Sequence, residues 1–255
     1  MKTPIENTQR ELKSCYTKKT HSTNALLWEM SRLSTLEEGF VVRADFQTAG
    51  KGQIGNSWES EAGKNLLFSM ILYPLRVPVE NQFLLSQIVS LGIKKALDEY
   101  TDGITVKWPN DIYWNEKKLV GILIENSLQG NKIKAAVIGI GLNVNQKTFV
   151  SNAPNPVSLL QITGKRQNRK VLLDKIHRNI MELYAQLNLS EIRTAYAEAL
   201  YRKDGFHTYS KETETFQAKI ISVHPDGQLE LETEAGERKG FYFKEVSFVL
   251  SPEVE

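Results

Sequence analysis

Lysine, asparagine and aspartate side chains flank the turns of the stretch ITVKWPNDIYWNEKKLVGILIEN, residues 104–126. Apolar and polar residues alternate up to Trp108, which predicts a half-buried strand, and Pro109 ends it because proline donates no backbone hydrogen bond. A second turn precedes an almost continuous apolar strand at residues 119–124. This folding places four polar side chains near two strand ends, where they could bind a phosphorylated or carboxylated ligand. They are Lys107, Asn110, Asp111 and Lys118. The alternative is a plain hairpin with solvated turns.

A glycine-rich loop with a central lysine is the second candidate. A strand expected at residues 40–46 runs into QTAGKGQIGNSW, residues 47–58. Residues 50–55 match the dinucleotide fingerprint G-x-G-x-x-G, but that fingerprint opens a helix, whereas here a second loop leads into a strand at residues 66–72. What remains is a long loop whose backbone N–H groups can approach an anion closely. A loop of this length between strands favours a functional role.

Two further segments end in polar residues that could face a ligand. Ser22 and Thr23 precede a helix-forming run, and a helix start that such residues cap also suits an anionic or polar ligand atom. Most Ser and Thr residues at such a position only cap the start of a helix. Residues 139–145, GIGLNVN, close another strand, where glycines allow a ligand against bare backbone and Asn143 and Asn145 offer donors and acceptors. A simple glycine-rich turn is the alternative there.

The elements that position these residues are strands covered by helices. Apolar spacing predicts an amphipathic helix within residues 79–100 and mostly helical structure up to about residue 203. The basic run at residues 165–170 could touch phosphate, although a solvated loop and helix start is the favoured interpretation. From residue 205 the pattern changes to short strands, which predicts a small barrel docked on the larger domain. We therefore expect a mixed α/β (α+β) fold with domains at residues 1–205 and 206–255.

Composition narrows the class of protein. The 255 residues are 41% hydrophobic and 24% charged with a net charge of +2, which is typical of a globular protein and argues against one that coats nucleic acid or anionic membrane. Cys15 is the only cysteine, and no apolar run approaches the roughly 20 residues of a membrane span. These features predict a cytoplasmic protein. The four histidines show no zinc spacing and no nucleophile motif occurs, so the polar groups point to binding anions and neutralising charge.

Taken in order, five motifs resemble those of biotin–protein ligases, also called biotin–[biotin carboxyl carrier protein] ligases. They are residues 22–24 (STN), 47–52 (QTAGKG), 107–111 (KWPND), 118–125 (KLVGILIE) and 139–143 (GIGLN). The resemblance covers nearly the whole chain and implies a mixed sheet flanked by helices, related to the catalytic domain of class II aminoacyl-tRNA synthetases, with an SH3-like β-barrel at the C-terminus. It also implies that biotin and Mg-ATP give biotinyl-5′-AMP and pyrophosphate, after which a lysine of a biotin carboxyl carrier protein attacks the mixed anhydride.

Residue roles follow from the same resemblance. Lys118, Lys51 and Asp111 would be catalytic, with Asp111 near ATP and magnesium, whose protein ligands are unknown. Biotin would be bound by Ser22, Thr23, Asn24, Gln47, Gly50, Lys51, Gly52, Gln53, Lys118 and Gly121. ATP and the adenylate would be bound by Lys51, Trp58, Lys107, Asn110, Gly141 and Asn143.

The chain departs from the family pattern in two places. The family's glycine loop is arginine-rich, whereas this one is GKGQIGN, and lysine lacks the two-pronged donor geometry of arginine. We therefore expect looser retention of the adenylate. About 20 residues precede Ser22, too few for the DNA-binding domain that some members carry. This predicts a monofunctional ligase without a DNA partner.

Two alternatives and two open points accompany this hypothesis. A lipoate or octanoate ligase or transferase shares the architecture but lacks KWPND and the Gly-x-Gly-x-Asn ending. A non-catalytic nucleotide-binding or RNA-associated module is a different class, suggested by the C-terminal meander and the basic run. The sequence is also compatible with a homodimer and does not identify which carrier protein is served.

Overall fold

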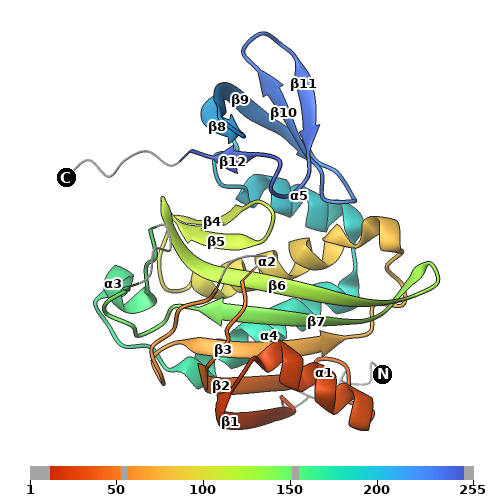
Figure 1. Cartoon of the computed structure of the whole chain (residues 1–255), viewed down its shortest axis with the longest axis vertical. Helices are drawn as coiled ribbons and strands as arrows, with labels where there is room; N and C mark the ends of the chain where they lie inside the picture. The colour runs from red at the N-terminus through yellow and green to blue at the C-terminus, as the bar shows by residue number, and fades with distance from the viewer. Residues whose placement is uncertain (1–11, 53–56, 151–154, 250–255) are drawn as a thin grey trace, which may run out of the picture.

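A seven-stranded sheet forms the body of the protein (Figure 1). The computed structural model describes residues 12–52, 57–150 and 155–249. Within them the strands lie in the order β1-β2-β3-β7-β6-β5-β4, and every pair is antiparallel except β1–β2. Their bounds are β1 Ser14–Thr20, β2 Val41–Gln47, β3 Leu66–Leu72, β4 Ile104–Lys107, β5 Asp111–Trp114, β6 Lys117–Gln129 and β7 Lys132–Leu142. The predicted folding of residues 104–126 into successive strands is confirmed.

Helices cover the two faces of this sheet unequally. Helix α1, Thr23–Leu33, packs on β2, β3 and β7 over a small apolar cluster that includes Val42, Ile71 and Val137. The other face carries the large core, built with α2, α4 and α5. Their bounds are α2 Phe83–Leu97, α4 Arg169–Gln186 and α5 Leu189–Ala199, and two short helices, η1 Val79–Asn81 and α3 Leu159–Thr163, complete the set. Strand β3 is buried along its whole length because both of its faces are covered.

The C-terminal strands form a second, antiparallel sheet (blue in Figure 1). Its order is β11-β10-β9-β8-β12, with bounds β8 His207–Lys211, β9 Glu214–Val223, β10 Leu229–Thr233, β11 Arg238–Phe241 and β12 Ser247–Phe248. The predicted mixed α/β class and C-terminal meander are confirmed. The described strands nevertheless leave two edges, β11 and β12, so they form an open sheet and not the closed barrel that was expected.

The two sheets share one core. Tyr209 and Leu231 of the second sheet belong to the same apolar cluster as Phe83 of α2. The indole N–H of Trp108 donates to the backbone carbonyl of Gly227 at 2.9 Å, which ties the end of β4 to the turn before β10. In the described part of the chain, no helix is long and apolar enough to cross a membrane.

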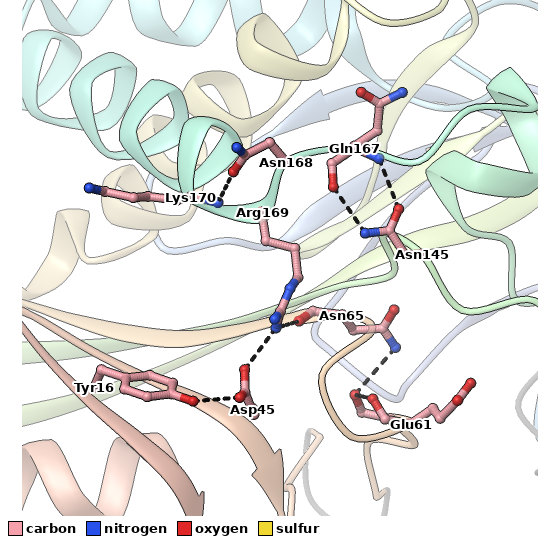
Figure 2. A network of polar contacts seen from close by, with 10 residues as sticks. Tyr16, Asp45, Glu61, Asn65, Asn145, Gln167, Asn168, Arg169 and Lys170 are labelled. Carbon is pink, nitrogen blue, oxygen red and sulfur yellow. Dashed lines mark hydrogen bonds and ion pairs between the residues drawn. The ribbon is translucent and has the colours of Figure 1, made fainter.

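The basic run at residues 165–170 starts a helix. Figure 2 shows Arg169 turned inward, where its guanidinium lies 3.0 Å from Asp45 of β2, and Tyr16 of β1 donates to the other carboxylate oxygen. Burial raises the pKa of Asp45, but the hydrogen bonds from Tyr16 and Arg169 outweigh it and hold that pKa below its usual value. Asn168 caps α4 through the backbone N–H of Lys170. This network anchors α4 to the sheet. The predicted helix start is confirmed, but Arg169 is not the solvated residue that the favoured interpretation expected.

Candidate active site

A cavity of about 590 Å³ opens where α1 begins, on the face of the sheet that α1 only partly covers. Its floor has no side chains of its own, because Gly121 of β6 and Gly141 of β7 lie directly opposite each other in the sheet. Gly139 lies two residues before Gly141 on β7. A Cβ atom at Gly139 would come within 2.3 Å of Asn24 Oδ1, so a side chain there would push α1 away. These glycines let a helix start and a ligand approach the sheet backbone.

Most of the residues predicted from the sequence line this cavity. They are Ser22, Thr23, Asn24, Gln47, Lys51, Gly52, Trp58, Lys107, Asp111, Lys118, Gly121, Gly141 and Asn143. Gly50 and Asn110 are not among the lining residues. Gly50 accepts the backbone N–H of Trp58 and closes the base of the loop, and buried Asn110 donates its amide to the carbonyl of Ile122. Gln53 lies outside the described residues.

One end of the cavity is built from buried amides and hydroxyls. Ser22 caps α1, and Gln47 at the end of β2 accepts the backbone N–H of Thr23 at 2.7 Å. Ser69, which is 0% exposed in β3, contacts both Thr23 Oγ1 at 2.7 Å and Asn24 Oδ1 at 2.6 Å. Such a fixed set of neutral groups suits a ligand that carries its own matching donors and acceptors.

The other end is cationic. Lys118 of β6 and Asp111 of β5 form an ion pair at 2.7 Å, and both side chains are about one quarter exposed. Lys107 donates to the hydroxyl of Tyr113 at 3.0 Å and lies over the rings of Tyr113 and Phe248. Burial lowers the pKa of Lys107 to about 8, which the nearby Asp111 carboxylate opposes and the Lys118 charge reinforces. Lys51 and Lys244 complete the basic lining, which can neutralise phosphate or carboxylate charge.

Trp58 lies between the two ends. Its indole covers the glycine floor, since Cβ atoms at Gly121 and Gly141 would come within 2.7 Å and 2.5 Å of the ring. Lys118 Nζ lies 5.7 Å from the ring centroid. Trp58 and Gly141 were predicted to bind the nucleotide and Gly121 to bind biotin, and in the structure all three lie together.

Two buried polar atoms on the cavity wall have no hydrogen-bond partner among the described residues. They are Trp58 Nε1 and Asn143 Oδ1. An unsatisfied buried donor or acceptor is costly, so a ligand that supplies the missing partner is favoured. Asn145, in contrast, is held outside the lining by two bonds to the backbone of Gln167 (Figure 2).

Several residues that shape this site were not predicted from the sequence. Ser69 looked like one more member of a buried strand, and only its polarity within LLFSMIL distinguished it. Glu125 accepts the Asn24 amide at 2.7 Å, and no role was predicted for it although it ends the KLVGILIE motif. Phe248 of β12, with Phe243 and Lys244 of the connection between β11 and β12, also lines the wall, which no local pattern indicated.

No group of three or more His, Cys, Asp or Glu with metal-binding geometry occurs in the described ranges. Among the residues that the structure describes, Asp111 and Glu59 are the carboxylates on the cavity wall. One or two carboxylates are compatible with Mg²⁺, because this ion keeps several waters and takes most of its other ligands from substrate phosphates.

Comparison with known proteins places this site in a family. Residues 16–143 match the biotin/lipoate A/B protein ligase family. The bifunctional ligase/repressor BirA of Bacillus spizizenii is 33% identical over 217 residues, which is 79% of this chain and 64% of that protein. The biotin–[acetyl-CoA-carboxylase] ligase of Mycobacterium tuberculosis is 31% identical over 168 residues, 63% of this chain and 60% of the relative. The chain therefore spans a little under two thirds of the length of these curated relatives.

A solved structure matches a larger part of this chain than these relatives do. The biotin protein ligase of Aquifex aeolicus in complex with biotin and ATP superposes with a TM-score of 0.77 and 29% identity, and the match covers 94% of this chain and 99% of that one.

Proposed function

The chain belongs to the biotin/lipoate A/B protein ligase family, and from that premise we propose that it is an ATP-dependent biotin–protein ligase. It would activate biotin as biotinyl-5′-AMP with release of pyrophosphate, and then transfer biotin to a lysine of a biotin carboxyl carrier protein. The observation that carries this proposal is a single cavity that joins a neutral hydrogen-bonding end to a cationic end.

The neutral end suits the ring system of biotin. A ureido group presents two N–H donors and one carbonyl acceptor, and the wall formed by Ser22, Thr23 and Gln47 offers fixed hydroxyl and amide groups to match them. The apolar part of biotin would then lie along the bare floor at Gly121 and Gly141, with the indole of Trp58 displaced from the floor or packed over the ligand.

The cationic end suits the reacting groups. When a carboxylate approaches a phosphate, two unit anions at 4 Å repel by about 4 kcal/mol at an effective dielectric constant near 20. Lys118, Lys51 and Lys107 oppose that repulsion, and Lys118 would be placed at the reacting carboxyl and stabilise the charge that develops there. Mg²⁺ bound to the ATP phosphates would add further charge neutralisation, with Asp111 the carboxylate best placed to contact it. Asn143 Oδ1, which lacks a partner among the described residues, would accept a donor from the nucleotide.

Other features are part of the same proposal. Residues 1–205 would bind biotin and ATP, and the domain at residues 206–255 would close one wall of the cavity through Phe243, Lys244 and Phe248. The carrier protein, a cytoplasmic location and homodimer formation are expectations that accompany it.

Biotin-dependent exchange of labelled pyrophosphate into ATP tests the first half-reaction, and streptavidin blotting of an apo carrier domain tests the second. We expect exchange with biotin and not with lipoate or octanoate. Exchange that requires lipoate or octanoate would instead identify the chain as a lipoate or octanoate ligase. No exchange with any of the three acids, from protein that is folded, would favour a non-catalytic nucleotide-binding module.

A further inference from the structure

Glu125 lies behind the neutral end of the cavity and is not one of its lining residues. It stands on β6, two residues after Leu123, and its Oε2 accepts the Asn24 Nδ2 amide at 2.7 Å. The same amide nitrogen lies 3.5 Å from the Leu123 carbonyl oxygen. Because both neighbours only accept hydrogen bonds while Glu125 is ionised, the Asn24 side chain must present its NH₂ group to them and its oxygen to the opposite side.

The oxygen of Asn24 determines where the Ser69 proton goes. Ser69 Oγ lies 2.6 Å from Asn24 Oδ1, a distance that requires a proton between the two oxygens. Asn24 Oδ1 has none to give, so the single hydroxyl proton of Ser69 is directed to it. Ser69 is completely buried, and water cannot supply a substitute donor.

The next link is the hydroxyl of Thr23. Its Oγ1 lies 2.7 Å from Ser69 Oγ and 3.0 Å from Gln47 Oε1, and it has one proton for the two contacts. The Ser69 proton is already committed, so the shorter contact takes the proton of Thr23. Gln47 Oε1 is satisfied in any case by the backbone N–H of Thr23 at 2.7 Å. The chain of donation therefore runs from Thr23 through Ser69 and Asn24 to Glu125.

This direction leaves the lone pairs of Thr23 Oγ1 for the cavity, which Thr23 lines. A chain of hydrogen bonds that ends on an anion polarises each member and makes the first oxygen a stronger acceptor. We infer that Glu125 is a positioning residue that sets the direction of this chain and thereby makes Thr23 an acceptor for an N–H donor of the ligand, which in biotin is a ureido nitrogen. The inference rests on the proposed function and deepens it.

A neutral amide in place of Glu125 would remove the stronger of the two constraints on Asn24, leaving only the long 3.5 Å contact to the Leu123 carbonyl. The NH₂ group of a glutamine could donate to Asn24 Oδ1 after the Asn24 amide turns over, and every bond of the chain could then reverse at the loss of only the long contact to the Leu123 carbonyl. Thr23 would receive the Ser69 proton and give its own to Gln47. Its remaining lone pair would no longer be polarised by a carboxylate.

Glu125→Gln therefore tests the inference with a change of almost no volume. We expect biotin affinity, measured by titration calorimetry on the intact protein, to fall about tenfold, the loss for a charge-assisted bond that becomes neutral. ATP affinity should stay within twofold. The matched control is Glu182→Gln, which removes a surface carboxylate that pairs with Lys95 at 3.5 Å and should change neither affinity. Thermal unfolding checks that each variant is folded. If Glu125→Gln does not fold, Ser69→Ala provides the same test, because it interrupts the series of hydrogen bonds at another position.

Moving the carboxylate from position 125 to position 24 distinguishes an effect of hydrogen-bond direction from the loss of a structural contact. In the double variant Asn24→Asp with Glu125→Gln, the carboxylate at position 24 can only accept from Ser69, so the original direction returns. We expect biotin affinity within about threefold of wild type, whereas loss of a merely structural contact would not be rescued. Wild-type affinity in Glu125→Gln and Ser69→Ala, or a double variant no better than the single one, would overturn the inference. A wild-type protein that does not bind biotin would instead overturn the proposed function.

Discussion

The two ends of the cavity offer different interactions to a ligand: directional hydrogen bonds at the neutral end and charge attraction at the cationic end. At the neutral end, Thr23, Asn24 and Ser69 are buried and bonded to one another, so their donors and acceptors have fixed directions. At the cationic end, Lys118 and Asp111 remain about one quarter exposed, and Lys51 is exposed on its loop. The first end can discriminate between molecules of similar shape, because a mismatched group there leaves a buried atom unpaired.

The cationic end is suited to stabilising charge that changes during the reaction. Charge attraction depends weakly on direction and can follow a group as its geometry changes from carboxylate to phosphoric anhydride. This difference predicts that changes at the neutral end alter affinity for biotin, whereas changes at the cationic end alter the rate of adenylation. Variants at each end can be ranked by how strongly they test this division.

The largest effect is expected for Lys118→Ala. Lys118 contacts the Asp111 carboxylate and the Trp58 ring, and under the proposed function its loss would leave the reacting carboxyl without the cation placed beside it. We expect pyrophosphate exchange to slow by about a hundredfold or more, the loss for one removed charge-stabilising donor, while biotin affinity falls much less. Steady-state exchange and calorimetry measure the two quantities.

The matched control is Lys117→Ala, at the neighbouring position of β6, because Lys117 is not one of the residues that line the cavity. Exchange in that variant should stay within twofold of wild type. Near-normal exchange in Lys118→Ala would contradict the assignment of Lys118 to the reacting carboxyl.

A smaller effect is expected in the dependence of stability on pH. Burial lowers the pKa of Lys107 from 10.5 to about 8, so the unfolded chain binds more protons than the folded one between these values. The free energy of unfolding should therefore rise with pH across this window, and Lys107→Met should remove that part of the rise. After a discount for partial solvent access, the difference is about 2 kcal/mol.

Urea unfolding of both proteins at several values between pH 7.5 and 10 measures this difference. Subtracting the two curves removes the titration of all other groups. Parallel curves would show that Lys107 keeps an ordinary pKa and that the aromatic surroundings of Tyr113 and Phe248 do not exclude water from it.

Sequence reasoning located the parts of this site that depend on short spacings. Lys107, Asp111 and Lys118 could be placed together because they flank turns between adjacent strands. That Gly121 faces Gly141 depends on the register of β6 against β7, which the two motifs did not contain. The polar chain through Ser69 joins three segments that are far apart in the sequence, so its pairings became visible only in the folded protein. The open C-terminal sheet was missed for a related reason, because strand spacing predicts a meander but not whether its edges meet.

The smallest effect concerns the glycine loop at the cationic end. Lys51 pairs with Ser57 across the base of this loop and lines the cavity, where a lysine offers one charged point and an arginine would offer a two-pronged donor. If charge there only needs to be neutralised, Lys51→Arg should leave adenylation within twofold. Added donor geometry should nevertheless hold the adenylate phosphate more firmly and lower release of biotinyl-5′-AMP about threefold.

Trapping released adenylate with hydroxylamine measures this leak. An unchanged or larger leak in Lys51→Arg would show that retention depends on charge alone, and the contrast between a directional end and a charge-neutralising end would then extend to this loop.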